Sequence, residues 1–170
     1  MTLERNIRCR LLPLLVLMSM SCGRKVEAAG VCAATDSRIV VETAKHRLAL
    51  CTGGQEAAVF GIRLGRGGVG KQAEGDGKTP LGTYALGAPR PSKRFGTFIP
   101  IGYPTVEQRK QGFTGGDVGV HGPFRWVRWL GSLVNTFDSS DGCVGVATDE
   151  EINAIADWIA KVHAQTIEIK

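Results

Sequence analysis

The chain has 170 residues, of which 43% are hydrophobic and 22% charged, a composition typical of a single globular domain with a buried core. Its 23 glycines and 7 prolines indicate many tight turns, which favours β structure over a helical bundle. The net charge is +5, part of the excess lies in the first 28 residues, and the remaining Lys and Arg residues form no stripe. We therefore expect no nucleic-acid partner.

The first 28 residues have the pattern of a secretory signal peptide. Three arginines precede the apolar run 11–18, which is much shorter than the ~20 apolar residues that a membrane-spanning helix needs. Two positions are possible for the end of this signal. Val26-Glu27-Ala28 suits cleavage after residue 28, whereas Ser19-Met20-Ser21-Cys22-Gly23 resembles a bacterial lipoprotein signal, which would end at residue 21 and place a lipid on Cys22. We expect export to the periplasm or cell envelope, with membrane attachment only through that lipid.

Residues 29–37 are expected to form a linker, and residues 38–170 one mainly β domain. Alternating or β-branched runs predict the strands 38–43, 47–51, 57–64, 83–86, 118–121 and 166–170. Thr148 and Glu151 form a capping box, and isoleucines follow at helical spacing, which predicts a helix over 149–163. The segment 123–138 is less regular and is expected to border a cleft.

Export permits disulfides, and this changes how the cysteines are interpreted. The first two predicted strands form a hairpin whose geometry brings Cys32 and Cys51 to the same side, so a disulfide between them is one open alternative. This bond would leave Cys143 as the unpaired thiol of the exported domain.

Cys143 has the surroundings of a nucleophile. It follows the turn-forming run Ser139-Ser140-Asp141-Gly142, and a cysteine nucleophile needs an exposed turn and a base that generates the thiolate. His121, at the end of a predicted strand and followed by Gly122, is the candidate base. Backbone N–H groups of the turn can form an oxyanion hole. The alternative is that Cys143 is a buried core residue, the commonest role of a lone cysteine.

Neither a metal nor a nucleotide cofactor is expected. Cys143, His121, His46 and His163 show no metal-ligand spacing. The G-x-G-x-x-G match at 65–70 is followed by a loop rather than by the helix that a dinucleotide site requires.

Taken as an ordered set, three motifs resemble the L,D-transpeptidase catalytic domain (the YkuD-like family). They are Asp76-Gly77-Lys78-Thr79-Pro80-x-Gly82, His121-Gly122 and Ser140-Asp141-Gly142-Cys143; the segment Ile101-Gly102-Tyr103-Pro104 is also similar. The resemblance implies a mainly β fold, a sandwich or barrel-like mixed sheet with one C-terminal helix. It implies Cys143 as nucleophile, His121 as base oriented by the Gly122 carbonyl, and an oxyanion hole in the turn formed by Asp141, Gly142 and Cys143.

Four further residues are expected to bind substrate: Asp76, Lys78, Thr79 and Ser140. The alternative for Asp76 and Lys78 is a role as solvated turn residues, which is the default for such a loop.

The resemblance also implies an activity on peptidoglycan stem peptides. Cys143 would form a thioester with the diaminopimelate residue of a stem peptide and transfer it to an amine of another stem or of an acceptor protein, without a cofactor. Two alternatives stay open. Water could resolve the same thioester, making the protein a peptidoglycan hydrolase (an L,D-carboxypeptidase or amidase), or the chain could be a non-catalytic wall-binding module.

The chain departs from the family pattern at two places. Asp141 stands where a second histidine is usual, and Val144-Gly145-Val146 lacks the arginine that usually follows the cysteine by two or three positions. A carboxylate aimed at the thiol would oppose thiolate formation. Arg125 or Arg128 could replace the missing arginine as a carboxylate clamp, although solvated surface charge is the simpler interpretation of both.

Overall fold

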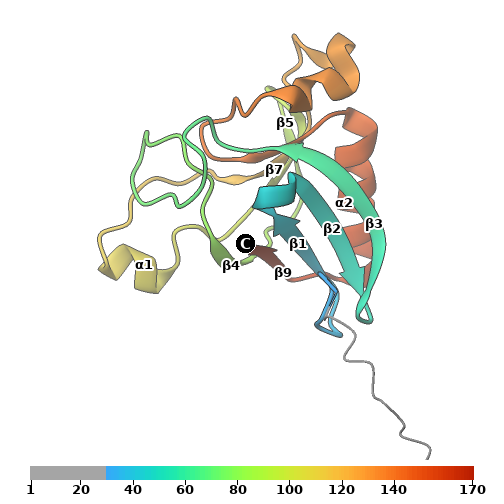
Figure 1. The fold of residues 1–170 in the computed structure, drawn as a ribbon, viewed down its shortest axis with the longest axis horizontal. Coiled ribbons are helices and arrows are strands. Elements are labelled where there is room, and N and C mark those ends of the chain that lie inside the picture. The colour runs from blue at the N-terminus through green and yellow to red at the C-terminus, as the bar shows by residue number, and fades with distance from the viewer. Residues whose placement is uncertain (1–29) are drawn as a thin grey trace, which may run out of the picture.

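Nine strands form one mixed sheet in the part of the chain that the computed structural model describes, residues 30–170 (Figure 1). They are β1 (Arg38–Glu42), β2 (Arg47–Thr52), β3 (Gln55–Arg63), β4 (Gly82–Ala85), β5 (Arg90–Ser92), β6 (Gly96–Pro100), β7 (Gly119–His121), β8 (Val144–Val146) and β9 (Thr166–Ile169). Their order is β4-β9-β1-β2-β3-β8-β7-β6-β5. The pairs β1–β9 and β7–β8 are parallel, and the others are antiparallel.

The sheet curls because β3 belongs to both of its halves. Its first seven residues, except Ala57, pair with β2, and its last two, Ile62 and Arg63, pair with β8. Figure 1 shows β3 as a long curved strand that links the two halves. Helix α2 (Asp149–Val162) packs on the sheet, and its buried isoleucines join the main core. The mainly β fold with a mixed sheet and a C-terminal helix is therefore confirmed.

The longer predicted elements are found within two residues of their expected bounds. The capping box of α2 is formed as expected, with Thr148 Oγ1 accepting the Glu151 N–H at 3.2 Å and Glu151 Oε2 accepting the Thr148 N–H. His163 ends the helix in the left-handed conformation. The hairpin of β1 and β2 turns through the 3-10 helix η1 (Thr43–Lys45).

Several short elements were not predicted: β5, β6, β8, the helix α1 (Val106–Lys110) and the 3-10 segment η2 (Arg128–Thr136). The predicted signal peptide and Cys22 lie outside the described residues. No helix within residues 30–170 is both long and apolar enough to cross a membrane.

The predicted disulfide between Cys32 and Cys51 is present, with a Cα–Cα distance of 5.3 Å. It attaches the segment expected to be a linker to β2. Alternate residues of the β1–β2 hairpin face opposite sides, so Val40, Ala49 and the disulfide form a second, smaller apolar cluster away from the main core. Cys143 is the free cysteine of the described part of the chain.

Candidate active site

Cys143 and His121 both line one pocket of about 360 Å³, in which the Cys143 thiol donates to the Asp117 carbonyl oxygen at 3.6 Å. Strands β7 and β8 are parallel neighbours, and His121 is in register with Gly145. Cys143 comes two residues before Gly145, so its side chain emerges on the same face of the sheet as His121. The pairing of two short strands thus brings together the predicted nucleophile and the predicted base.

His121 is held as a neutral base. Its side chain is 1% exposed, and Nδ1 lies 2.6 Å from the carbonyl oxygen of Gly122. Because a carbonyl can only accept, Nδ1 carries the proton, which leaves Nε2 free to take one from a thiol. Burial lowers the pKa of His121 to about 4, since the Gly122 hydrogen bond offsets this effect only in part.

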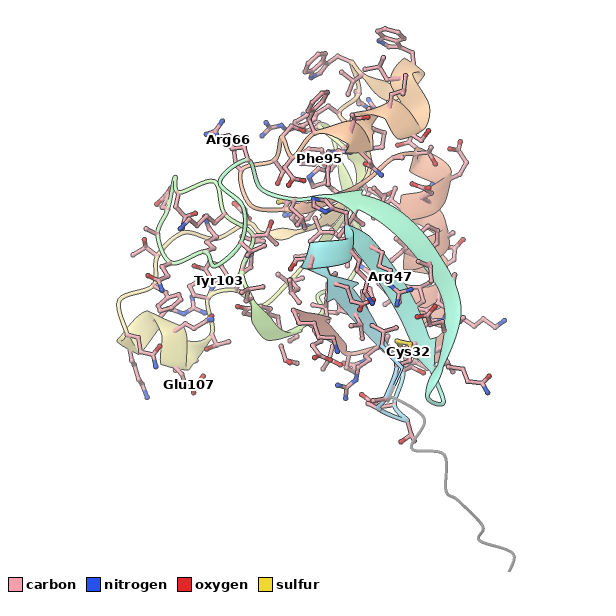
Figure 2. The ribbon with its side chains drawn as sticks, viewed as in Figure 1. Cys32, Arg47, Arg66, Phe95, Tyr103 and Glu107 are labelled. Carbon is pink, nitrogen blue, oxygen red and sulfur yellow. A yellow bond between two sulfur atoms is a disulfide. The ribbon has the colours of Figure 1, made fainter. Side chains whose placement is uncertain are left out.

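The phenyl ring of Phe95 fixes the plane of the imidazole. The two rings stack with centroids 3.7 Å apart and an angle of 23° between their planes. Phe95 in turn packs against Phe124, and Arg94 lies over the Phe124 ring at 4.8 Å. The base is therefore restrained on one side by Gly122 and on the other by an aromatic cluster (Figure 2 labels Phe95).

Cys143 is a protonated thiol in this resting arrangement. Burial raises the pKa of Cys143, and a hydrogen bond from the Gly119 backbone and the charge of Arg94 reverse this only partly. With a neutral imidazole in the same pocket, the thiol keeps its proton until it attacks. The arrangement suits general-base transfer to His121 during attack rather than a preformed ion pair.

The turn before Cys143 is fixed by Ser140. Its hydroxyl donates to the Cys143 carbonyl oxygen at 2.6 Å and accepts the Gly142 N–H at 3.1 Å. Among the N–H groups of the turn predicted for the oxyanion hole, that of Gly142 is thus already donated to Ser140. Gly142 has φ +126°, and a Cβ atom there would lie 2.6 Å from the Lys78 carbonyl oxygen, so the position requires glycine.

Asp141 lines the Cys143 pocket, and its negative charge acts to raise the pKa of Cys143. Its carboxylate pairs with Arg66 at 3.0 Å, and both side chains are 65% exposed. Figure 2 shows Arg66 at the outer rim of the molecule. The carboxylate that replaces the usual histidine is therefore solvated and paired with a cation.

The loop that contains Asp76, Lys78 and Thr79 packs against the turn before Cys143, where the Lys78 carbonyl lies close to Gly142. Asp76 accepts from Lys71 Nζ at 2.8 Å and from three backbone N–H groups of its own loop. Burial alone would raise the pKa of Asp76, but these donors hold it well below its usual range. Thr79 is buried and accepts the Gly65 N–H at 2.8 Å. Of the four residues predicted to bind substrate, Ser140 lines the Cys143 pocket, whereas the side chains of the other three do not.

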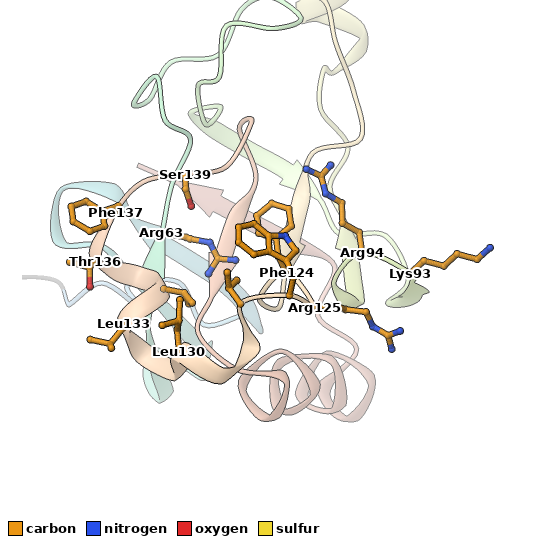
Figure 3. A pocket seen from close by; sticks show the side chains of 13 residues that line it. Arg63, Lys93, Arg94, Phe124, Arg125, Leu130, Leu133, Thr136, Phe137 and Ser139 are labelled. Atoms are coloured by element: carbon orange, nitrogen blue, oxygen red, sulfur yellow. The ribbon is translucent and has the colours of Figure 1, made fainter.

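A larger pocket of about 900 Å³ adjoins the first and shares Arg94 and Phe124 with it (Figure 3). Its walls are mostly apolar side chains of the segment 123–138, which was expected to border a cleft. Arg125 lines this larger pocket, and Arg128 forms an ion pair with Asp149. Neither arginine lines the Cys143 pocket.

Sequence reasoning missed Arg63, Arg94, Phe95 and Phe124. All four act through contacts between segments far apart in the chain, and no local motif marks them. Within residues 30–170, no group of three or more His, Cys, Asp or Glu side chains is arranged to hold a metal ion.

A model of the L,D-transpeptidase catalytic domain (YkuD) matches residues 36–169. The chain belongs to this family. The match covers the whole curled sheet and α2, and it includes all the residues that surround Cys143. A search of curated proteins found no match.

Solved structures with the same fold include L,D-transpeptidases. The helical cell shape determining protein Pgp2 from Campylobacter jejuni is 22% identical with a TM-score of 0.63, over 79% of this chain and 47% of Pgp2. Bd1075 from Bdellovibrio bacteriovorus is 23% identical with a TM-score of 0.58, over 81% of this chain and 49% of Bd1075. An L,D-transpeptidase from Mycobacterium smegmatis is 14% identical with a TM-score of 0.50, over 79% of this chain and 58% of that enzyme. The chain thus matches about half the length of these proteins.

Proposed function

We propose that the protein is an exported L,D-transpeptidase that acts on peptidoglycan stem peptides through Cys143. The observation that carries this proposal is the pairing of a free thiol with a neutral histidine whose Nδ1 is held by the Gly122 carbonyl in the same pocket. Membership of a family named for this reaction supports it.

In the proposed reaction, the Cys143 sulfur attacks the carbonyl carbon of the peptide bond between diaminopimelate and D-alanine. The thiol proton passes to Nε2 of His121, and the Cys143 N–H stabilises the oxyanion. The C–N bond then breaks, His121 returns the proton to the leaving D-alanine amine, and a thioester remains. An amine of a second stem, or of an acceptor protein, attacks the thioester and regenerates the thiol.

The pocket contains two arginines that can bind the carboxylates of this substrate class, besides Asp117 and Asp141. Stem peptides carry free carboxylates, and Arg90 and Arg94 both line the Cys143 pocket. Arg90 lies 4.0 Å from Asp117, whereas Arg94 takes part in none of the ion pairs formed within residues 30–170. Arg94 is therefore the guanidinium most available to a substrate carboxylate.

Hydrolysis is the second candidate function, since water can resolve the same thioester. The similarity to Pgp2 supports this candidate, because Pgp2 is described by its role in helical cell shape rather than by cross-linking. A hydrolase would use every residue of the site in the same role and differ only in the acceptor.

Two assays on the purified protein test these functions: the first tests for the acyl-enzyme that both share, and the second separates transfer from hydrolysis. Incubation with a carbapenem should acylate Cys143 in the wild type and not in Cys143→Ala, as read by intact-protein mass. Incubation with tetrapeptide muropeptides should then give cross-linked dimers. Shortened monomers alone would establish hydrolysis instead. A folded protein that forms no adduct and changes no muropeptide would refute both enzymes and favour a wall-binding module.

Export and lipid attachment also belong to this proposal and rest on the sequence of residues 1–28. Labelling cells with a lipid precursor should mark the wild type and leave Cys22→Ala unmarked. An unlabelled wild type recovered from the periplasm would indicate cleavage after residue 28 instead.

A further inference from the structure

Arg63, the last residue of β3, is a buried guanidinium without an acidic partner. The residue is 1% exposed, and it takes part in none of the ion pairs formed within residues 30–170. Its Nη1 donates to the Val146 carbonyl at 3.0 Å and to Asn135 Oδ1 at 3.3 Å. A buried charge that lacks a counter-charge is costly, so simple packing does not account for an arginine at this position.

The third hydrogen bond of Arg63 reaches the catalytic pair. Its Nη2 donates to the Gly122 carbonyl oxygen at 3.3 Å, and the same oxygen accepts the Nδ1–H of His121 at 2.6 Å. One carbonyl therefore joins the guanidinium to the imidazole. Figure 3 shows Arg63 among the side chains that line the larger pocket, together with Ser139 and Phe124.

The positive charge of Arg63 and the ionisation of Cys143 favour each other, which is what a nucleophilic thiolate needs. Burial lowers the pKa of Arg63, and negative charge on Cys143 acts to raise it, so the guanidinium and a thiolate stabilise each other. The same cation contributes to the lowered pKa of His121, whose main cause is burial.

Gly145 provides the space that Arg63 fills. The two residues are cross-strand partners in the β3–β8 pair. A Cβ atom on Gly145 would lie 2.6 Å from Arg63 Cζ and 2.7 Å from Nε. Any side chain at position 145 would displace the guanidinium, and position 145 is one of the two places, two or three residues after the cysteine, where the family pattern usually has an arginine.

We propose that Arg63 is a positioning residue for the catalytic pair, and that it supplies from β3 the guanidinium that the strand of the nucleophile lacks. It fixes the Gly122 carbonyl that orients His121 and places a positive charge near Cys143. Position 145 requires glycine because any side chain there would collide with the Arg63 guanidinium. The inference rests on the proposed function in one respect, that Cys143 is a nucleophile.

The first test replaces Arg63 with methionine, which keeps most of its volume. Exchanging a buried charge for an apolar group is often neutral or stabilising, so Arg63→Met should keep the thermal stability of the wild type or exceed it. Its rate of carbapenem acylation should nevertheless fall about 100-fold, because small errors in orientation carry penalties of that size. Arg38→Met, in β1 and away from both pockets, is the matched control and should react like the wild type.

The pH profile distinguishes positioning from structural support. In Arg63→Met, the acid limb of acylation should move to higher pH because His121 becomes easier to protonate. Alkylation of Cys143 by iodoacetamide should also need higher pH because the thiolate loses a cation. Alkylation does not require a substrate, so it tests Arg63 even if the wild type fails to react with a carbapenem.

A double-mutant cycle tests the link to Gly145. Gly145→Ala should slow acylation as much as Arg63→Ala, and the double variant should be no slower than Arg63→Ala alone. Additive losses would refute the steric relation. The proposal as a whole is overturned if Arg63→Met reacts at the wild-type rate and its pH profiles of acylation and alkylation are unshifted. It is also overturned if Arg63→Met fails to fold, since the guanidinium would then serve the fold.

Discussion

The protonation of His121 links the candidate site to the stability of the fold. Its pKa is about 4, below the ~6.5 of an exposed histidine, because the ring is buried. Between these values the unfolded chain binds more protons than the folded one. The stability that this group contributes is therefore complete above about pH 6.5 and is lost as the pH falls towards 4.

We expect this single group to lower the free energy of unfolding by roughly 2–3 kcal/mol between pH 7 and pH 4.5. Urea unfolding at the two pH values measures the change. His121→Gln, which lacks the titrating ring, should show a decrease smaller by that amount. An equal decrease in both proteins would mean that His121 is accessible to protons in the folded state.

The same pKa predicts the acid limb of the reaction. His121 stays neutral, and so able to accept a proton, down to about pH 4. Carbapenem acylation should therefore keep its rate from pH 7 to about pH 5 and fall by half only near pH 4. Stopped-flow acylation across this range, corrected for the folded fraction at each pH, measures the limb. Half-loss near pH 6.5 would contradict a buried, neutral base.

At the scale of residues, local motifs predicted the atoms that react but not those that hold them in place. Cys143 and the pair His121-Gly122 are recognisable because a turn, a strand end and their order in the chain mark them. Arg63 and Phe95 are not, because Arg63 meets the site only after β3 pairs with β8, and Phe95 only after β6 pairs with β7. Asp76 shows the converse, since its motif predicted a substrate contact and its carboxylate is occupied by its own loop.

At the scale of elements, the turn before Cys143 is the part least able to accept change. Gly142→Ala places a Cβ atom against the Lys78 carbonyl at a φ of +126°, a conformation that side chains rarely adopt. We expect a loss of about 1–3 kcal/mol of stability and a more than tenfold slower acylation, since the turn must shift. Thermal unfolding and carbapenem kinetics measure the two effects.

Gly61→Ala in β3 is the control for this substitution. Its Cβ atom would meet only Asn135 at 3.7 Å, an ordinary contact, so both measurements should stay close to the wild type. Wild-type kinetics in Gly142→Ala would show that the turn is not needed in its present form.

Element prediction succeeded where the local sequence shows a clear pattern. Helix α2 and strands β1 to β3 are long enough to show a period, and they were predicted nearly to their ends. Strand β8 has three residues with glycine at its centre, and β5 contains a proline, so neither displays one. These short strands form only because neighbouring strands supply their hydrogen-bond partners, which a reading of local sequence does not include.

At the scale of the whole molecule, the disulfide cluster and the catalytic residues lie at different ends of the curled sheet. The disulfide and its small apolar cluster lie at the lower end of the β1–β2 hairpin, while Phe95, which stacks on His121, lies at the opposite end (Figure 2). No residue of the disulfide cluster lines either pocket. A change confined to the disulfide should therefore alter the fold's stability without altering the reaction.

Replacing both disulfide cysteines, Cys32→Ser with Cys51→Ser, tests this separation. The bond closes a segment with a sequence separation of 19 residues, and its loss should lower the free energy of unfolding by about 3 kcal/mol. At 25 °C the folded double variant should be acylated by a carbapenem at the wild-type rate, and the adduct should map to Cys143. Slower acylation in a sample that is still folded by circular dichroism would show that the disulfide end of the sheet transmits strain to β7 and β8.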